Sequence, residues 1–361
     1  MKLTRLEVKS FRNLKELQLN AADGVNVIYG ENGQGKTNLL EAIWLFTGSK
    51  SFRGASTSEL IPLGGDRADI LLCYDDGIRQ NELRMMLGDK KEIMQNAVSL
   101  GSATELCGGF CCVVFSPVHL NLIKGSPSER RKLIDVIIGQ MKPRYLSVLS
   151  EYNRILLQRN TLLKDVQFSS SLLDTLDIWD MALSKKGALI TKTRQSFIEK
   201  LTPFCSDFYE GISNGRESFD MSYQSNIEID GEISDETMLS QLKAARPEDL
   251  RNGTTSIGPQ RDDILINING ISARSFGSQG QQRSGVLAIK LGEAALMNEL
   301  LGQTPVILLD DVMSELDDSR RDFLLHRLED KQIFITCCDP NQIFDVDRAF
   351  EVSEGKIVKT E

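Results

Sequence analysis

The segment Gly30–Thr37, with the sequence GENGQGKT, constrains the fold of this chain more than any other feature. It matches the phosphate-binding pattern G-x-x-x-x-G-K-[ST] in full. The apolar run Gly24–Tyr29 precedes it and predicts a strand, and apolar residues at helical spacing follow from Lys36. Glycines at such a turn let backbone N–H groups surround phosphate oxygens at the positive end of a helix. The sequence therefore predicts an α/β fold with a nucleotide site.

The individual residues of this P-loop have different predicted roles. The Lys36 ammonium is placed to reach the β- and γ-phosphates of ATP, and the Thr37 hydroxyl is placed to hold Mg²⁺. The predicted ATP-binding residues are Gly30, Glu31, Asn32, Gly33, Gln34, Gly35, Lys36 and Thr37.

The segment Val306–Asp311, with the sequence VILLDD, is the expected partner of the P-loop. It predicts a buried strand that carries two carboxylates at its C-terminal end. Asp310 is predicted to bind Mg²⁺ through water, because this ion keeps most of its hydration shell. Asp311 is placed to polarise the attacking water. Apolar runs that end in aspartate are common, but the combination with a P-loop 274 residues upstream of Asp310 is specific, so ATP and Mg²⁺ are the predicted cofactors.

Two further segments indicate an ATPase of the ABC type. Ser278–Ser284, with the sequence SQGQQRS, precedes a predicted helix and resembles the ABC signature. A serine and free amides at a helix start can clamp a phosphate held by a second subunit, which predicts a head-to-tail dimer. The alternative interpretation is a polar turn before a helix. The predicted trans-acting residues are Ser278, Gln279, Gly280, Gln281 and Gln282, and Ser314 and Asp317 belong to a predicted loop (D-loop) that crosses the dimer interface.

The middle of the chain departs from the α/β pattern. Ser126, Pro127 and Glu129 have the N-cap, first-turn proline and capping-box positions of a helix start. Apolar residues between Tyr145 and Leu201 then recur at helical steps, with a serine-rich break at 169–171. This predicts two antiparallel helices of about 20–30 residues in an arm about 30–45 Å long, although ordinary core helices are an alternative. The predicted domains are head residues 1–118, a coiled-coil-like arm at 119–215, and head residues 216–361.

Charge is distributed unevenly along the chain. The net charge is -9, yet residues 119–200 carry 14 Lys and Arg against 8 Asp and Glu, so this segment is +6 and the remainder is -15. Such asymmetry indicates a surface that meets an anion, or a solvated helix face. The densest cations in this segment are candidate DNA contacts, namely Lys124, Arg130, Arg131 and Lys132.

Other sequence features exclude whole classes of protein. No apolar run approaches the roughly 18 residues of a membrane span, and the first residues lack the apolar stretch of a signal peptide. The 7 cysteines have no regular spacing and the chain has only 2 histidines, which argues against a disulfide framework and a Cys/His zinc site. We therefore expect a cytoplasmic protein with reduced cysteines.

Eight segments together resemble the RecF family of bacterial recombination mediators over nearly the whole chain. Two positions depart from the family pattern: Gln260 stands where histidine is usual, and Val118-His119 replaces an acidic residue that usually follows Ser116-Pro117. The segments that carry the resemblance are Ser10–Asn13, Gly30–Ala42, Ser51–Arg53, Lys124–Arg131, Gln158–Asn160, Gly258–Asp263, Ser278–Arg283 and Leu309–Asp317.

This resemblance implies more than the residue patterns do. It implies an ABC-type head related to the heads of structural-maintenance-of-chromosomes proteins, dimerisation on ATP, and slow, DNA-stimulated hydrolysis that acts as a switch. It also implies binding to single-stranded, double-stranded and gapped DNA in recombinational repair, replication restart and the SOS response. The implied partners are RecO and RecR, with which such proteins help to load RecA.

Three other classes share some of these motifs. An ABC transporter subunit shares the P-loop, the signature and the dimer, but nothing in this chain implies a membrane-spanning partner. A small-molecule kinase shares the P-loop but needs no phosphate clamp from a second subunit. The head of a longer chromosome-maintenance protein fits the motifs but requires a much longer coiled coil. Stimulation of ATP hydrolysis by DNA would separate the repair function from the first two.

Overall fold

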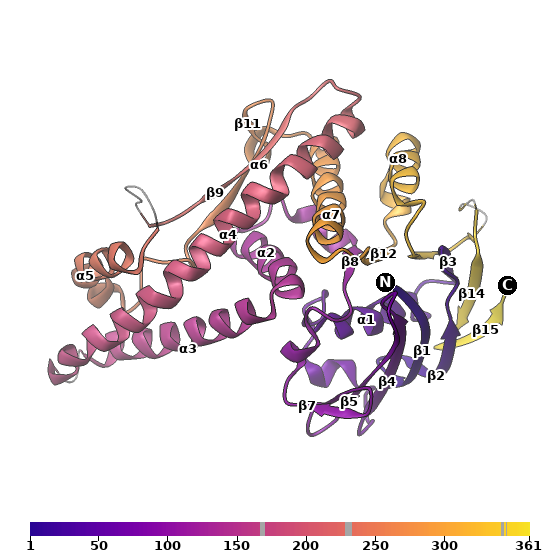
Figure 1. The fold of residues 1–361 in the computed structure, drawn as a ribbon, viewed down its shortest axis with the longest axis horizontal. Coiled ribbons are helices and arrows are strands. Elements are labelled where there is room, and N and C mark those ends of the chain that lie inside the picture. Colours follow the sequence, from indigo (N-terminus) through magenta and orange to yellow (C-terminus); the bar gives the residue numbers. More distant parts are fainter. Residues whose placement is uncertain (167–169, 228–232, 341–342, 344) are drawn as a thin grey trace.

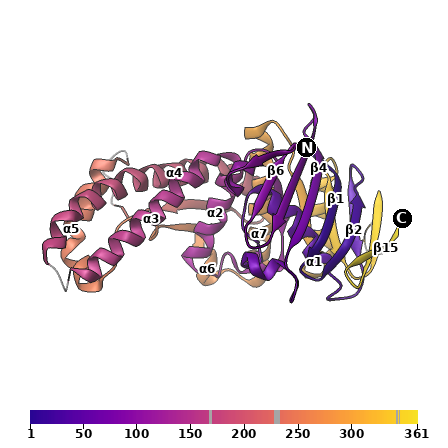
Figure 2. The same ribbon diagram turned by 90° about the horizontal axis from the view of Figure 1, so that it is seen from below.

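The computed structural model describes residues 1–361 except 167–169, 228–232, 341–342 and 344. The molecule is elongated, with a head of sheets at one end and a helical arm at the other (Figures 1 and 2). Both termini lie in the head (Figure 1). Among the described residues, no helix is both long and apolar enough to cross a membrane.

A six-stranded sheet forms the centre of the head. Its order is β15-β14-β3-β13-β12-β8, and all neighbours are parallel except β14 and β15. β12 and β13 are buried at every position, as expected for parallel strands covered on both faces. Predicted strands at 24–29, 111–115, 306–309 and 333–336 are confirmed here. The strands are β3 (Val25–Tyr29), β8 (Cys112–Phe115), β12 (Val306–Asp310), β13 (Ile333–Cys337), β14 (Arg348–Ser353) and β15 (Lys356–Thr360).

A second, antiparallel sheet covers one face of the central sheet. Its order is β2-β1-β4-β5-β6-β7, and helix α1 (Lys36–Trp44) packs between the two sheets. Inward side chains such as Leu6 and Val8 on β1 and Leu308 on β12 share one core with α1. The strands are β1 (Lys2–Phe11), β2 (Leu14–Asn20), β4 (Ala68–Asp75), β5 (Gln80–Leu87), β6 (Glu92–Gln95) and β7 (Val98–Leu100).

The arm contains the two antiparallel helices that the sequence predicts, but their limits differ from the prediction. α2 (Pro127–Met141) ends before Pro143, and α3 (Pro143–Asp165) begins there, because proline cannot donate an intrahelical bond but fits a first turn. α4 (Leu176–Ser213) has 38 residues and continues past Pro203, since Leu201, Cys205 and Tyr209 remain buried at steps of four. The capping box at the start of α2 is confirmed.

A fourth helix, α5 (Asp235–Asn252), packs on α4 and was not predicted. Its apolar signal is weak, because Met238 and Leu242 are its only buried apolar residues. Figure 2 shows α5 beside α3 and α4 at the far end of the arm. α5 comes from the segment assigned to the head, and the proposed domain limits stay a prediction.

A fully buried arginine joins the three long helices of the arm. Arg159 on α3 donates to Asp180 on α4 at 2.6 Å and to Asp249 on α5 at 2.7 Å, and all three side chains are inaccessible to solvent. It also donates to the Thr255 hydroxyl at 2.8 Å. Removal of one partner from such a network leaves an uncompensated buried charge, so these residues hold the arm together.

A small third sheet lies at the base of the arm, in the order β11-β10-β9. Hydroxyls of α4 cover the free edge of β9: Thr202 donates to the carbonyl of Met221 at 3.0 Å, and Ser206 donates to that of Phe219 at 2.7 Å. The predicted Asn269-Gly270 turn is confirmed, with both residues at positive φ. The strands are β9 (Phe219–Gln224), β10 (Asp263–Ile268) and β11 (Ile271–Ser272).

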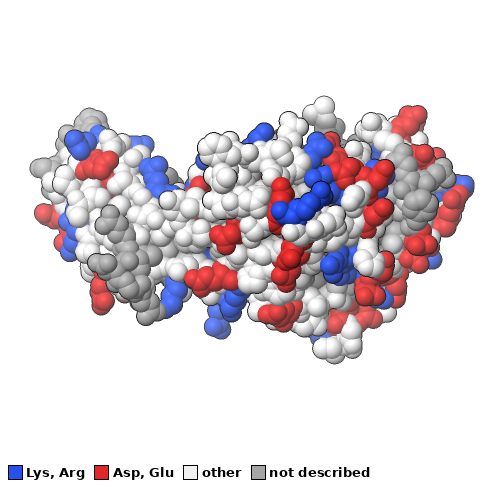
Figure 3. All heavy atoms as spheres, turned by 90° about the horizontal axis from the view of Figure 1, so that it is seen from above, with Lys and Arg blue, Asp and Glu red and all other residues white. Residues whose placement is uncertain are grey.

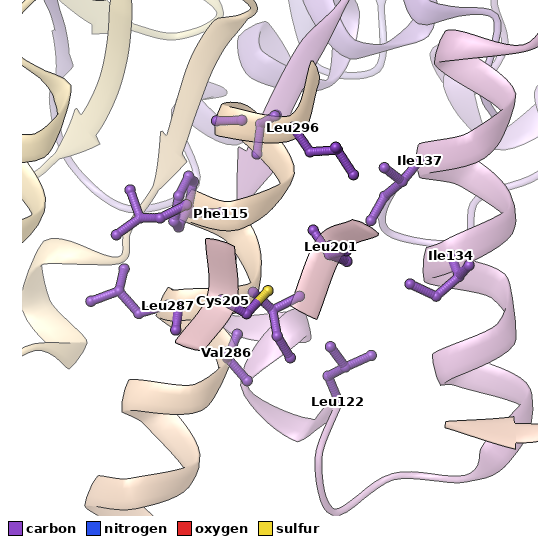
Figure 4. Close-up of a cluster of buried hydrophobic side chains, with 14 of the residues drawn as sticks. Phe115, Leu122, Ile134, Ile137, Leu201, Cys205, Val286, Leu287 and Leu296 are labelled. Carbon is purple, nitrogen blue, oxygen red and sulfur yellow. The ribbon is translucent and has the colours of Figure 1, made fainter. Parts of the chain in front are cut away.

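Helix α7 (Gln279–Leu301) connects the arm to the head. It packs against α4 and β8 on the face of the central sheet opposite α1. Its contact with α4 is close, because a Cβ at Gly292 would lie 2.7 Å from Cys205 Sγ. Figure 4 shows the shared core, to which β8, α2, α4 and α7 contribute side chains. The labelled residues are Phe115, Leu122, Ile134, Ile137, Leu201, Cys205, Val286, Leu287 and Leu296.

Helix α8 (Asp318–Leu328) packs against the C-terminal part of α4. A Cβ at Gly211 would lie 2.8 Å from the ring of Phe323, and the Arg327 guanidinium lies over the rings of Phe208 and Phe323. The end of α4 is therefore in contact with both α7 and α8.

Candidate nucleotide-binding site

The P-loop joins β3 to α1, as the sequence predicts. Gly30, Gly33 and Gly35 all have positive φ, which residues with a Cβ rarely adopt. A Cβ at Gly30 would also lie 2.3 Å from the carbonyl oxygen of Val352 on β14. The turn is therefore tight because of its glycines, and its backbone is exposed to an approaching phosphate.

Lys36 is the first residue of α1 and is almost fully buried beneath the loop. Its ammonium donates to the carbonyls of Gly30 at 2.7 Å and Glu31 at 3.0 Å. The thiol of Cys338, in the segment after β13, lies 3.9 Å from the same nitrogen. The charge is thus held within the curve of the loop, where phosphate oxygens would replace the carbonyls as its partners.

The predicted magnesium ligands lie together. The Thr37 hydroxyl donates to Oδ1 of Asp310 at 2.8 Å, and the Thr336 hydroxyl lies 3.2 Å from the same oxygen. Burial raises the pKa of Asp310 above its usual value, and the hydrogen bond from Thr37 opposes this shift. The described residues contain no cluster of three Asp, Glu, His or Cys side chains that could hold a metal. A hydroxyl and one carboxylate fit Mg²⁺ that takes its remaining oxygens from phosphates and water.

Asp311 has a left-handed backbone, with φ 52°. Its N–H donates to the Thr336 hydroxyl at 2.9 Å, and its carbonyl accepts from the Ser314 hydroxyl at 2.8 Å. A non-glycine residue in this region costs energy, and such residues concentrate at functional sites. The Asp311 carboxylate lies 3.5 Å from the Thr336 hydroxyl, which is also the neighbour of Asp310.

Three hydrogen-bonded side chains support the P-loop: Asn13 from the turn between β1 and β2, Asn38 from α1, and Arg53. The sequence motifs assigned no role to these residues. Asn13 donates to the carbonyl of Gly33 at 2.7 Å, Asn38 donates to Asn13 at 2.7 Å, and Arg53 donates to Asn38 at 2.9 Å. A cavity of about 1130 Å³ opens beside these residues and is also lined by residues 57–59 and 61–66. The only sequence signal for this layer was the resemblance of Ser10–Asn13 and Ser51–Arg53 to family segments.

The predicted signature segment forms the start of α7. Ser278 is the N-cap: its Oγ accepts from the N–H of Gln281 at 3.2 Å, and the Gln281 side chain accepts from the Ser278 N–H at 2.8 Å. Gln279 and Gly280 lie in the exposed first turn, whereas Gln282 is buried. The segment thus has the geometry of a helix start that presents backbone amides.

The predicted D-loop is connected to the signature helix. Asp317 is the N-cap of α8 and accepts from the N–H of Arg320 at 3.0 Å. Arg320 in turn donates to the Ser284 hydroxyl on α7 at 2.9 Å, and Arg283 pairs with Glu315 at 2.9 Å. The structure therefore joins these two motifs to each other. α1 and α7 lie on opposite faces of the central sheet, so the signature and P-loop helices are separated within one chain (Figure 1).

The four candidate DNA contacts differ in accessibility. Arg130 is buried, pairs with Asp263 at 2.8 Å and donates to three backbone carbonyls, so the expectation that it contacts phosphate is corrected. Arg131 donates to the carbonyl of Asp262 at 2.6 Å, and burial lowers its pKa. Lys124 and Lys132 are exposed. On the face in Figure 3, acidic side chains gather over the head and the arm carries scattered charges.

The segment Gly258–Asp263 has a structural role at the base of the arm. Gln260, the departure from the family pattern, accepts a hydrogen bond from the Tyr152 hydroxyl on α3 and donates to the carbonyl of Ile257 at 3.0 Å. Buried Asp262 accepts from the Tyr223 hydroxyl and from the N–H of Asn226. The amide of Gln260 thus meets its hydrogen-bonding needs inside the fold.

Comparisons with known proteins agree with this geometry. The profile of the RecF/RecN/SMC N-terminal domain matches residues 2–104. The DNA replication and repair protein RecF of Agathobacter rectalis is 39% identical over 363 residues, which cover 99% of each chain. This chain belongs to the RecF family. The resemblance predicted from the sequence is therefore confirmed.

Solved structures support the same assignment. A structure of the recombination mediator protein RecF with ATPrS, described as part of the RecFOR pathway, has a TM-score of 0.93 and 36% identity, and the match covers 98% of this chain and 97% of that one. The Smc head domain of Pyrococcus furiosus has a TM-score of 0.57 at 17% identity, which shows a shared fold alone. The predicted ABC-type head with a helical insertion is confirmed, and ATP binding is supported for this RecF-family chain.

Proposed function

We propose that two copies of this RecF-family chain close around two ATP molecules and that the dimer binds DNA in recombinational repair. The observation that carries this proposal is the division of the site. The P-loop and Asp310 lie together at one end of the central sheet, while the Ser278 helix start lies on its other face and is tied to the D-loop through Arg320. One chain therefore holds two half-sites, which a two-fold dimer would complete.

ATP would bind with its phosphates in the P-loop and its base toward the adjacent cavity. Lys36 would exchange its two carbonyl partners for β- and γ-phosphate oxygens, and the exposed amides of the loop would bind the remaining ones. Thr37 and Asp310 would hold Mg²⁺, which neutralises charge on the phosphates when it is bound. The cavity beside Asn13 and Asn38 has room for the base and ribose.

Asp311 would position the water that attacks the γ-phosphate. Its left-handed backbone holds the carboxylate at the end of β12, and hydrogen bonds that Asp311 donates to Thr336 and accepts from Ser314 maintain that turn. Positioned bases of this kind accelerate reactions by about 10² to 10⁴. The amides of Ser278 and its neighbours would come from the second subunit, so hydrolysis would require the dimer. Slow hydrolysis would then return the dimer to its open state.

The DNA surface would include Lys124 and Lys132 at the base of the arm, which are exposed. Contacts of this type bind phosphates without reading bases, so the complex would recognise a structure such as a single-strand gap or junction rather than a sequence. The relatives named as DNA replication and repair proteins, and the RecF structure named in the RecFOR pathway, support a role in recombination together with RecO and RecR. We propose that this role is to help load RecA.

Sedimentation of the wild-type chain tests this function directly. The protein is run alone, with Mg-ATP, and with Mg-ATP and gapped duplex. We expect a monomer-to-dimer shift with ATP and co-sedimentation of the dimer with DNA. Hydrolysis should rise when gapped DNA is added. Lys36→Met is the control for nucleotide dependence, and a chain that binds ATP but stays monomeric with and without DNA would refute the proposal.

A further inference from the structure

An exposed aromatic ring lies directly before the signature segment. Phe276 ends the short helix α6 (Ala273–Phe276) and is 77% exposed, whereas the other large apolar side chains that are exposed in the described part of the chain are mostly aliphatic. Single exposed apolar residues are common and need no explanation by themselves. Phe276 differs because it lies only two residues from Ser278, which places their Cα atoms within about 7 Å of each other.

The backbone that carries Phe276 is fixed relative to Ser278. Gly277 donates its N–H to the carbonyl of Ala273 at 3.1 Å. The buried side chain of Gln282 donates to the carbonyls of Ala273 and Gly277, both at 3.0 Å. These bonds tie α6 to the first turn of α7. A partner that contacts Ser278 would therefore meet the Phe276 ring at a set position.

Three consecutive apolar residues, here called the rim, line part of the cavity beside Asn13 and Asn38. Ile61, Pro62 and Leu63 line this cavity together with Asn13 and Asn38. Leu63 is fully exposed, whereas Ile61 and Pro62 are partly exposed. Asn13 also donates to the P-loop carbonyl of Gly33, so the cavity that the rim lines adjoins the phosphate site. The chain thus has an exposed aromatic ring beside one half-site and, at a cavity that adjoins the other, an exposed leucine flanked by two partly exposed apolar residues.

We propose that Phe276 of one copy packs against the rim Ile61–Leu63 of a second copy and closes the open cavity beside the shared ATP. This contact rests on the dimer proposed above. Two-fold symmetry makes it reciprocal, because a dimer that brings one Ser278 to a P-loop brings the other Ser278 to the second P-loop. Each ATP would then be enclosed by an apolar contact as well as by the phosphate clamp.

A disulfide-trapping experiment between two single variants tests the contact. Phe276→Cys protein is mixed with Leu63→Cys protein, with and without Mg-ATP, under mild oxidation, and linked peptides are identified by mass spectrometry. We expect a 276–63 linkage only with ATP. Introduction of Ser278→Arg into the Phe276→Cys partner should abolish it. ATP-dependent dimers in sedimentation without this linkage would overturn the contact and leave the dimer standing, whereas wild-type protein that never dimerises would overturn both.

A substitution series gives an independent measurement of the same contact. Phe276→Ala should weaken ATP-dependent dimerisation at least tenfold, and Phe276→Leu should retain most of it, since the leucine still fills the rim. Ile271→Ala is the matched control. Ile271 is also an exposed apolar residue near α6, but it lies seven residues before Ser278, whereas Phe276 lies two residues before it. The control should change the dimerisation constant less than twofold. Equal effects of Phe276→Ala and Ile271→Ala would overturn the contact.

Discussion

The hydroxyl of Thr37 lies 2.8 Å from Oδ1 of Asp310, although 273 residues separate them in the chain. Thr37 is the second residue of helix α1, and Asp310 ends strand β12. Strand β3, which precedes the P-loop, and strand β12, which contains Asp310, are separated in the sheet only by β13. Their hydrogen bond joins the first and last parts of the sequence into one site, so that loss of either residue affects the same function.

Lys36→Met should abolish ATP binding. The substitution removes the ammonium that now binds two loop carbonyls and would bind phosphate oxygens. Charged hydrogen bonds contribute about 1.5–3 kcal/mol each, so the affinity should fall at least about 100-fold. Calorimetric titration with Mg-ATP measures this loss. Lys50→Met, an exposed lysine outside the P-loop, is the control, and wild-type affinity in Lys36→Met would refute the site.

Asp311→Asn should preserve the fold and ATP binding but slow hydrolysis by about 10² or more. Asparagine tolerates the left-handed backbone that this position requires, whereas alanine does not. Asp311→Ala should therefore also lower the free energy of unfolding, by about 1 kcal/mol. Single-turnover hydrolysis and urea unfolding of both variants separate the chemical role from the conformational one. Normal hydrolysis by the asparagine variant would exclude Asp311 as the water-positioning residue.

Ser278→Arg should leave ATP binding by the monomer unchanged and block ATP-dependent dimers. The arginine would occupy the space that the partner's γ-phosphate needs. Because Ser278 is also the N-cap of α7, its loss costs about 1 kcal/mol of stability, and Ser278→Ala controls for this effect. Sedimentation with ATP compares the two. If the alanine and arginine variants dimerise equally poorly, the lost cap explains the defect and the trans clamp is not supported.

Lys124→Ala and Lys132→Ala should each weaken DNA binding and reduce the slope of log affinity against log salt by about 0.9. Each lysine is exposed and would release one counterion on binding phosphate. The measurement is a salt titration of ATP-bound protein on gapped duplex. Unchanged slopes in both variants would move the DNA surface elsewhere.

Arg130→Ala should act on stability instead. The substitution leaves Asp263 and three backbone carbonyls without their partner, which should lower the free energy of unfolding by about 3 kcal/mol. At temperatures where the variant remains folded, its salt slope should equal that of the wild type. A reduced slope with normal stability would show instead that Arg130 reaches phosphate.

Stability should decline with falling pH because of His119. Burial lowers the pKa of His119 well below its ordinary value of 6.5, and its Nδ1 has no hydrogen-bond partner among the described residues. The unfolded imidazole therefore binds protons first, so the stabilisation is complete above about pH 7 and falls below about pH 6.5, by up to about 1.4 kcal/mol per pH unit. Urea unfolding from pH 7.5 to 5 should show a shallower decline for His119→Phe than for wild type. Exposed His326→Phe is the control, and equal slopes in all three would contradict the assignment.

The nucleotide motifs could be predicted because each is local. A P-loop requires a strand, glycines and a helix in sequence, and all three are visible between Val25 and Trp44. The same holds for the strand before Asp310 and the cap at Ser278. The support of Gly33 by Asn13 was not predicted, since this contact joins a turn of the antiparallel sheet to the P-loop and leaves no periodic pattern.

The misjudged features depend on distant partners. Arg130 was predicted as a candidate DNA contact, and its carboxylate partner, Asp263, could not be recognised because it lies 133 residues away. α5 carries few apolar residues and is held to α3 and α4 by Asp249, which no helical pattern reveals. The break between α2 and α3, in contrast, has a local signal in the sequence. Pro143 lies inside the predicted helix, and a proline at such a position indicates the start of a new helix.

Helix α4 is one continuous helix that packs on α3 and α5 in the arm and on α7 next to the head. Its 38 residues correspond to a rod about 57 Å long, and its C-terminal part packs on α7, which begins at the signature, and on α8, which begins at the D-loop. A rotation of about five degrees at that end would displace the opposite end by about 5 Å. If the proposed dimer forms, a small movement of α7 or α8 at its interface would therefore produce a larger displacement at the tip of the arm.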